Sequence, residues 1–256
     1  MPARERRMKF DAFGPVMARP LGVRGHQKRS LLVASVTMGR ELRVESELER
    51  CTALALDVHP GVSQLAPQPF TARLDLEQLF PTKKAALLAY PPIDPEEGLD
   101  GQPERLYTPD FAALAGLSQY AVESKHSSRL EGLAEPLSFR RSVLDRLGYR
   151  FITVTELDVG HPGLAGNLVH LRDAMNYHGK NDTRAESESL ACALSQRSEP
   201  FLLQEIRGQV SDLGIYLGLA RGVIACDLRQ GSLGIKTQVW PAHGDLAHLQ
   251  LINLEG

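Results

Sequence analysis

The chain has 256 residues, 43% hydrophobic and 23% charged side chains and a net charge of −2, which argues against a disordered chain, a fibrous repeat or a uniformly basic nucleic-acid binder. It has no run of about 18 apolar residues and no apolar stretch at its start, so the sequence predicts neither a transmembrane helix nor a secretory signal, and indicates a cytoplasmic protein. Three widely spaced cysteines argue against a disulfide framework or a CxxC metal site.

Positive charge is concentrated at the start of the chain. The first forty residues carry nine arginine and lysine side chains against Glu5 and Asp11, a net charge of +7. Such an arm could neutralise DNA phosphates, which would make binding depend on salt. A solvated basic tail explains the same composition.

Residues 30–45 contain two short β-prone runs separated by Met38-Gly39-Arg40, a pattern that predicts a hairpin. A helix is expected next. Ser46 stands where an N-cap would, and Glu49 follows at the spacing of a capping box. The stretch from Asp57 to Pro60 should end this helix.

The pattern from Val62 to Leu74 is strand-like but interrupted by Pro67 and Pro69, which suits a strand at the edge of a sheet. Several prolines then make residues 75–105 less regular. This stretch is predicted to be an insertion or a long surface loop.

Two strands are predicted next, Leu106 to Leu114 and Tyr120 to Lys125, joined by the turn-like segment 115–119 into a hairpin. Residues 136–147 have the pattern of a helix that ends at a glycine. Residues 149–155 form a further buried strand.

The periodicity stops between Leu157 and Gly163, which is the best candidate for a domain boundary. We therefore divide the chain into a first domain, 1–160, and a second, 161–256. The second domain has the pattern of a winged helix, with helices followed by a terminal β-ribbon. The predicted elements are helices at 165–178, 183–198, 200–209 and 211–220, then strands at 223–228 and 233–239 around a turn at 229–232.

The central hairpin carries residues suited to phosphodiester hydrolysis, which needs a neutralised phosphate and a deprotonated water; Mg²⁺ bound by carboxylates can provide both. Side chains alternate along a strand, so Glu123 and Lys125 project to one side. Asp110 lies on the neighbouring strand, where both carboxylates can reach one ion if the register is right. The backbone carbonyl of Ser124 could add an oxygen, which favours Mg²⁺ or Mn²⁺ over Zn²⁺.

Pro109-Asp110 followed by Glu123-Ser124-Lys125 is the PD-(D/E)xK pattern of a large nuclease superfamily. Short patterns of this kind also arise by chance, and an exposed hairpin with solvated side chains is the simpler interpretation. The predicted α-β-β-β-α-β order is the one expected of this α/β, restriction-endonuclease-like core with its mixed sheet. Glu49 opens the first helix of that order, although its capping role explains it without catalysis.

Taken together, these segments resemble TnsA, the endonuclease subunit of heteromeric cut-and-paste transposases. The similarity covers most of residues 40–160 and continues more loosely beyond. It is carried by Ser46-Glu47-Leu48-Glu49, the stretch 62–70 ending in Gln68-Pro69-Phe70, Thr108-Pro109-Asp110-Phe111, Val122-Glu123-Ser124-Lys125, and the helix and strand of 141–156.

The resemblance implies a nuclease domain that binds Mg²⁺, with Mn²⁺ as a substitute, and cuts one strand of double-stranded DNA at each transposon end. Position by position, it implies that Glu49, Asp110, Glu123 and Lys125 form the active site. It also implies a bacterial protein with two partners: TnsB, a DDE-type transposase that cuts the other strand, and TnsC, an AAA+ ATPase regulator that binds the C-terminal region.

The chain departs from the family around this motif. Members can carry glutamine where this chain has Glu123, and they tend to have an aliphatic residue and a proline where it has Ser124 and His126. A glutamate at position 123 strengthens the prediction of a metal site, because its side chain is a carboxylate. His126 points to the opposite face from Glu123 and is expected to be a non-catalytic neighbour.

Two other functions remain open. The chain could be a stand-alone nuclease of restriction or recombination, which would cut DNA without a transposase. It could also be a winged-helix regulator whose first domain has lost its chemistry.

Overall fold

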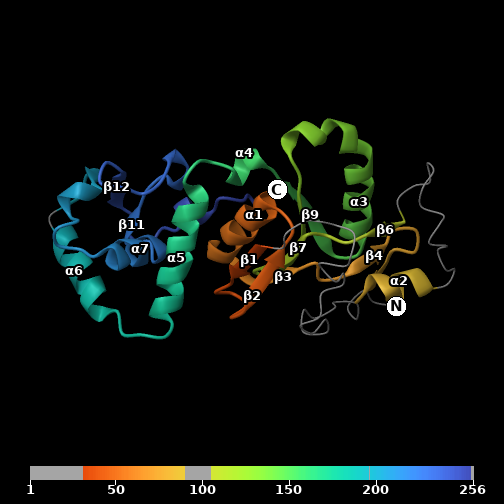
Figure 1. Cartoon of the computed structure of the whole chain (residues 1–256), viewed down its shortest axis with the longest axis horizontal. Coiled ribbons are helices and arrows are strands. Elements are labelled where there is room, and N and C mark those ends of the chain that lie inside the picture. The colour runs from red at the N-terminus through yellow and green to blue at the C-terminus, as the bar shows by residue number, and fades with distance from the viewer. Residues whose placement is uncertain (1–30, 90–104, 196, 255–256) are drawn as a thin grey trace.

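The structure, a computed structural model, describes residues 31–89, 105–195 and 197–254. Residues 1–30 of the predicted basic arm lie outside these ranges. The protein is a mixed α/β protein whose largest sheet has the strand order β3-β7-β8-β9 (Figure 1). β7 is antiparallel to both β3 and β8, whereas β9 is parallel to β8. The strands are β3 (Val62–Pro67), β7 (Phe111–Ala115), β8 (Ser118–Ser124) and β9 (Tyr149–Val154).

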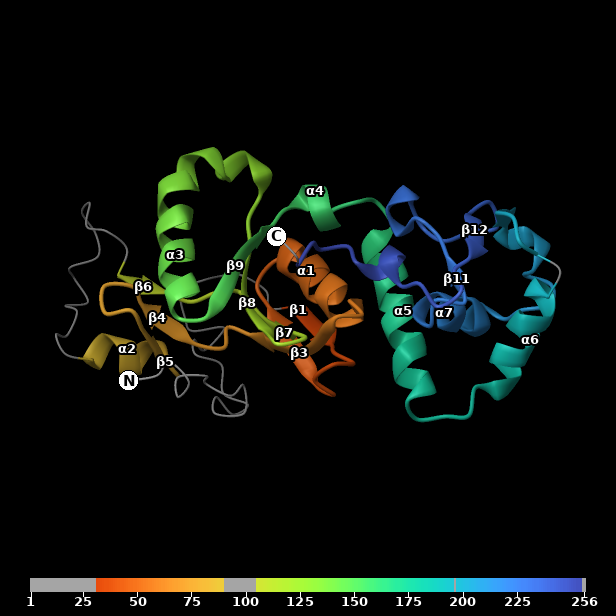
Figure 2. The ribbon, with the colours of Figure 1, turned by 180° about the vertical axis from the view of Figure 1, so that it is seen from behind.

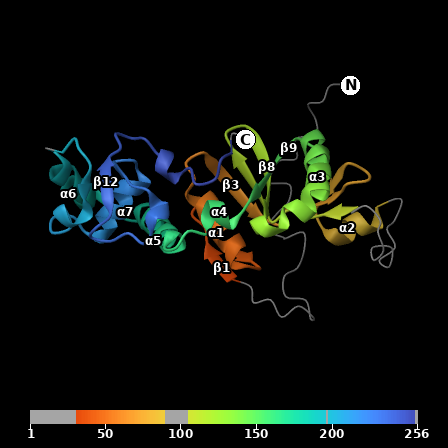
Figure 3. The ribbon, with the colours of Figure 1, turned by 90° about the horizontal axis from the view of Figure 1, so that it is seen from above.

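Helices α1 (Glu47–Val58) and α3 (Ala134–Arg146) cover opposite faces of this sheet (Figures 2 and 3). The alternation of side chains along the strands produces both faces. Phe111 and Val122 belong to the core that contains α1, whereas Ala112 and Ala121 belong to a second core against α3. α3 is also the crossover that parallel pairing of β8 and β9 requires.

The first predicted helix is confirmed as α1. The Ser46 hydroxyl accepts the Glu49 N–H at 3.1 Å, and the Glu49 carboxylate accepts the Glu45 N–H at 2.8 Å. At the other end of α1, the buried Asp57 accepts the Ser35 hydroxyl at 2.5 Å, which ties the helix to the preceding hairpin. That hairpin, also as predicted, consists of β1 (Leu31–Ala34) and β2 (Glu41–Val44).

The prediction of a long surface loop at 75–105 is wrong for its described part, which contains a strand at 78–80 and a helix at 83–88. The strand-like stretch 62–74 divides at Gln68-Pro69, and its second half pairs in a small antiparallel sheet of order β5-β4-β6. A fully buried Arg73 supports this sheet, because its guanidinium pairs with Asp75 at 2.7 Å. The pairing of β4 with β6 joins Ala72 to Tyr107, a long-range contact that local sequence did not reveal. The elements are β4 (Thr71–Arg73), β5 (Gln78–Phe80), α2 (Lys83–Leu88) and β6 (Leu106–Tyr107).

The chain beyond β9 is mainly helical, with a three-stranded sheet of order β10-β12-β11. The helix predicted at 200–209 is wrong, because Phe201 and Leu202 pair with β12 and a single 3-10 turn follows. The hairpin turn predicted at 229–232 is also wrong, since the segment 226–237 separates the paired strands. The elements are α4 (Glu156–Val159), α5 (Leu164–His178), α6 (Arg184–Leu194), α7 (Asp212–Ala220), β10 (Phe201–Leu202), β11 (Ile224–Ala225) and β12 (Gln238–Pro241).

Asn167, a buried polar residue on α5, explains why 226–237 is not a tight turn. Its side-chain amide donates to the carbonyls of Leu228 and Gly231, at 3.2 and 2.7 Å, and accepts the Leu233 N–H at 2.9 Å. These bonds hold the segment against α5.

The main apolar core is continuous across the predicted domain boundary. It runs from Val33 to Leu254 and includes residues of both α1 and α5, which pack together (Figure 1). The last described residues turn back towards the first part of the chain, where the His59 ring is hydrogen-bonded to the backbone of Ile252. The division at residue 160 falls between α4 and α5 and stays a prediction.

None of the helices in the described ranges has both the length and the apolar composition that crossing a lipid bilayer requires.

Candidate active site

Asp110 and Glu123 lie close together at the end of the β7–β8 pair, since the charge of Glu123 raises the pKa of Asp110. The last paired residues are Phe111 and Val122, and Asp110 directly precedes β7, so continuing this register would set Asp110 opposite Glu123. Directly opposite residues of an antiparallel pair project to the same face. That face is the one that carries Ala112 and Ala121 and packs against α3. The two carboxylates therefore converge on one side of the sheet.

Lys125 completes this group. Its Nζ lies 2.7 Å from Glu123 Oε1, so the alternation expected along β8 holds at the end of the strand. Asp110 Oδ2 accepts the backbone N–H of Ser124 at 2.7 Å. Because the Lys125 N–H bonds to Val154 of β9, the N–H and carbonyl of Ser124 point towards the opposite neighbour, the side where Asp110 lies.

Repulsion between neighbouring carboxylates affects the pKa values in this site. Burial, followed by repulsion from Glu123 and Glu49, raises the pKa of Asp110 to about 8. For Lys125, burial alone would lower the pKa, but attraction to Glu123 and Asp110 outweighs it and the net pKa is raised. Lys125 therefore stays protonated, while ionisation of Asp110 is unfavourable and a nearby cation would favour it.

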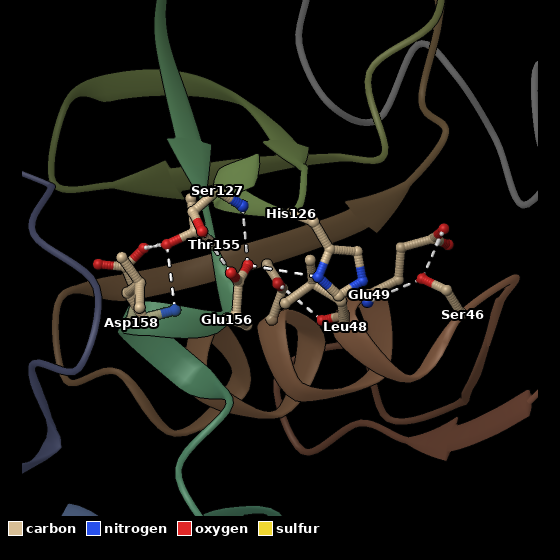
Figure 4. Close-up of polar contacts among 10 residues, drawn as sticks. Ser46, Leu48, Glu49, His126, Ser127, Thr155, Glu156 and Asp158 are labelled. Carbon is tan, nitrogen blue, oxygen red and sulfur yellow. Dashed lines mark hydrogen bonds and ion pairs between the residues drawn. The ribbon is translucent and has the colours of Figure 1, made fainter. Parts of the chain in front are cut away.

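Glu49 is not brought into contact with the other acids. Its carboxylate caps α1 by accepting from the Glu45 N–H at 2.8 Å and the Ser46 hydroxyl at 3.1 Å (Figure 4). It is still close enough to raise the pKa of Asp110. The geometry therefore gives Glu49 a capping role and a longer-range electrostatic influence.

Two residues that sequence reasoning missed contact Glu123 directly. The Tyr107 hydroxyl donates to Glu123 Oε2 at 2.8 Å, and Arg140 Nη1 lies 3.5 Å from Glu123 Oε1. A signal for Arg140 was present in the sequence, because it falls on the apolar stripe of its helix between Leu137 and Leu144. Tyr107 lies three residues before Asp110, with nothing in its local pattern to mark it.

Gln68 is a third unforeseen feature of this region. Its backbone N–H donates to the Asp110 carbonyl at 2.9 Å, and its φ of 41° is unusual for a residue with a side chain. Its Oε1 atom is buried and has no hydrogen-bond partner among the residues that the structure describes. An unpartnered buried oxygen and a strained backbone at one position both cost free energy, and such costs concentrate at functional sites.

The donor set fits a hard cation such as Mg²⁺ but not a site built from protein side chains alone. In the ranges that the structure describes, no three Asp, Glu, His or Cys side chains gather closely enough to hold a metal ion. Asp110 and Glu123 would supply two carboxylates, and the carbonyl of Ser124 and water would supply neutral oxygens. Mg²⁺ is commonly bound by one or two carboxylates with several waters retained.

His126 is turned away from this group. Its Nδ1 lies 3.4 Å from Glu156 Oε2, and Glu156 also accepts the Ser127 N–H at 2.9 Å and the Ser127 hydroxyl at 2.5 Å (Figure 4). These bonds lower the pKa of Glu156 to about 2, the Ser127 hydroxyl contributing most. Glu156 thus ties the chain after Lys125 to the start of α4.

Comparison with protein-family models and with curated proteins finds no match to this chain. Its function therefore has to be inferred from the geometry and chemistry of its own side chains.

Proposed function

We propose that the chain is a magnesium-dependent DNA endonuclease of the PD-(D/E)xK type, acting as the TnsA-like subunit of a cut-and-paste transposase. The observation that carries the proposal is the grouping of three side chains at the end of the β7–β8 pair. Lys125 Nζ lies 2.7 Å from Glu123 Oε1, and Glu123 is close enough to Asp110 for its charge to raise the pKa of Asp110. Paired acids beside an ammonium provide a cation site and a positive group for a phosphodiester.

Each residue has a distinct task in this reaction. Asp110 and Glu123 would hold the cation through carboxylate oxygens, and the backbone carbonyl of Ser124 would be a further ligand. When bound, Mg²⁺ would lower the pKa of a water and neutralise charge on the phosphate. Lys125, kept protonated by its neighbours, orients the attacking water or donates to a phosphate oxygen. Glu49 acts on Asp110 through its charge while it caps α1.

The order of the elements supports the nuclease assignment. α1, β3, β7, β8, α3 and β9 follow one another in the α-β-β-β-α-β order expected of a restriction-endonuclease-like core, with β4, β5, α2 and β6 inserted. The helices of the second half, followed by the antiparallel pair β11 and β12, support a winged-helix module.

The resemblance to TnsA gives the substrate and partners of the proposal. The substrate is double-stranded DNA at the transposon ends, with cleavage of one strand at each end. A DDE-type transposase, TnsB, cuts the other strand, and an AAA+ ATPase, TnsC, binds the C-terminal part of this chain.

Removal of the acidic pair tests the proposal. We expect Asp110→Ala and Glu123→Ala to fold but to lower strand cleavage by more than about 100-fold, since even outer-shell changes at metal sites can cost that much. The measurement is nicking of plasmid DNA that carries the element's ends, with Mg²⁺ and the partner subunits. Asp182→Ala, at an exposed carboxylate outside the site, is the matched control.

Full cleavage by a folded Asp110→Ala protein would refute the proposal. Cleavage that needs no partner would favour a stand-alone nuclease. A wild-type protein that neither binds Mn²⁺ nor cuts DNA would favour a winged-helix regulator without catalytic activity.

A further inference from the structure

The Glu123 carboxylate is held by side chains from three parts of the fold. Tyr107 reaches Oε2 from β6, Arg140 reaches Oε1 from α3, and Lys125 reaches Oε1 from the end of β8. Tyr107 and Glu123 are each only 4% exposed. This convergence involves two elements other than the strand that carries Glu123.

Tyr107 and Arg140 also contact each other. The Arg140 guanidinium lies over the Tyr107 ring, 4.6 Å from its centroid. Tyr107 in turn packs edge-on against Phe151, with ring centroids 6.0 Å apart. Packing therefore fixes the ring, and the ring helps to fix the guanidinium. Neither group can turn away from Glu123 without disturbing the core against α3.

The Tyr107 hydroxyl donates a hydrogen bond to Glu123 Oε2 at 2.8 Å. A carboxylate oxygen can accept about two hydrogen bonds. Lys125 and Arg140 both contact Oε1. Among the described residues Oε2 accepts from Tyr107, so it can accept one more positively charged partner.

We propose that Tyr107 and Arg140 are positioning residues that hold the Glu123 carboxylate in the orientation needed to share a divalent cation with Asp110. The inference rests on the nuclease function proposed above. It assigns the two residues the role that outer-shell partners have at other metal sites, where they orient the ligating group and tune its charge.

Titration of the full-length chain with MnCl₂ by calorimetry tests this inference. Tyr107→Phe removes one hydroxyl and keeps the ring, and we expect it to weaken Mn²⁺ affinity by about 10- to 100-fold. Tyr149→Phe is the matched control. Tyr149 lies in the same apolar core, at 3% exposure, and packs on Phe70 rather than Glu123. The Tyr149→Phe protein should therefore bind Mn²⁺ with the affinity of wild type.

Arg140→Lys is the second variant, and it decides the question if Tyr107→Phe does not fold. Lysine keeps the charge but loses the planar group that lies on the tyrosine ring. We expect Mn²⁺ affinity to fall here as well. Strand cleavage by both variants should recover as the MnCl₂ concentration is raised, whereas cleavage by Asp110→Ala should not recover. General destabilisation would not produce that difference.

The outcomes separate this inference from the nuclease proposal. Wild-type binding of Mn²⁺ with unchanged affinity in folded Tyr107→Phe and Arg140→Lys would overturn the positioning role and leave the nuclease proposal standing. Absence of Mn²⁺ binding in the wild-type chain would overturn both.

Discussion

Asp110 is the residue whose surroundings differ most from those of an ordinary surface carboxylate. It lies close to Glu123, within electrostatic reach of Glu49, and accepts one backbone N–H from Ser124. Burial and repulsion outweigh that hydrogen bond and the attraction of Lys125, so its pKa rises to about 8. At neutral pH the metal-free site therefore favours a proton on Asp110, which a bound cation would replace.

This raised pKa predicts a pH dependence of stability. Because the folded state holds the proton more tightly than the unfolded chain, the free energy of unfolding should fall as pH rises from 3.8 to about 8. Asp110→Asn keeps an acceptor for Ser124 without the charge. We expect it to be more stable than wild type by about 2 kcal/mol at pH 8 in a chelator.

Urea unfolding at several pH values provides the measurement. Asp182→Asn, at an exposed position, should differ from wild type by less than about 0.5 kcal/mol. A wild-type stability that does not change over this pH range, or an Asp110→Asn protein that is less stable at pH 8, would contradict the expectation.

At the scale of elements, the start of the connection between β8 and α3 is held at two points. Lys125 donates its N–H to Val154 of β9, and Ser127 donates to Glu156 at the start of α4. The backbone of Lys125 is thus attached directly, and a second attachment follows two residues later. The contact between His126 and Glu156 adds to the same attachment, so His126 has a structural role in this connection.

Glu156 should accordingly control the local stability of this connection. We expect Glu156→Ala to speed hydrogen exchange at the Ser127 amide by roughly five- to tenfold, and Glu156→Gln, which retains an acceptor oxygen, to have a smaller effect. The pKa of Glu156 is lowered to about 2. Protection should therefore be complete above the ordinary pKa of a glutamate and be lost as pH falls towards 2. Equal exchange in wild type and Glu156→Ala would show that other contacts hold the segment.

At the scale of the whole molecule, the part that contains the four-stranded sheet and the mainly helical part after β9 share one core. α1 packs on α5, and the buried side chains of Leu251, Ile252 and Leu254 close the same cluster. This continuity gives the C-terminal residues a role in stabilising the part that carries Asp110 and Glu123.

A shared core predicts one cooperative unfolding transition. Calorimetric and van't Hoff enthalpies should agree, and Ile252→Ala should lower the free energy of unfolding by about 2–5 kcal/mol, because it removes buried methyl groups. Ile235→Ala, at a position that is 49% exposed, is the control and should change it by less than about 0.5 kcal/mol. Two separate transitions, of which Ile252→Ala shifts one, would mean that the halves unfold independently.

The sequence by itself determined the local elements of the site and part of its geometry. The capping residues Ser46 and Glu49 predicted α1, and the alternation along a strand predicted that Glu123 and Lys125 share a face. These features follow from interactions between residues a few positions apart, so a local pattern is enough to reveal them.

Tertiary structure alone decided the register of the central hairpin. The predicted turn at 115–119 is centred on Leu117 and would place Asp110 opposite Ser124. The observed two-residue turn, with Gly116 at a φ of 57°, pairs Ala115 with Ser118 and Phe111 with Val122, a register that leads Asp110 towards Glu123 instead. A shift of one residue moves a side chain to the other face of a sheet, so the encounter of the two carboxylates depended on this turn.

The same limit explains the elements and residues that the sequence did not reveal. Contacts between residues far apart in the chain form the pairing of β10 with β12, the pairing of β4 with β6, and the contacts of Tyr107 and Arg140 with Glu123. Their free energy comes from pairing and burial that exist only once distant segments meet. Local sequence therefore predicted which residues could carry the chemistry, and the packed fold decided which of them meet.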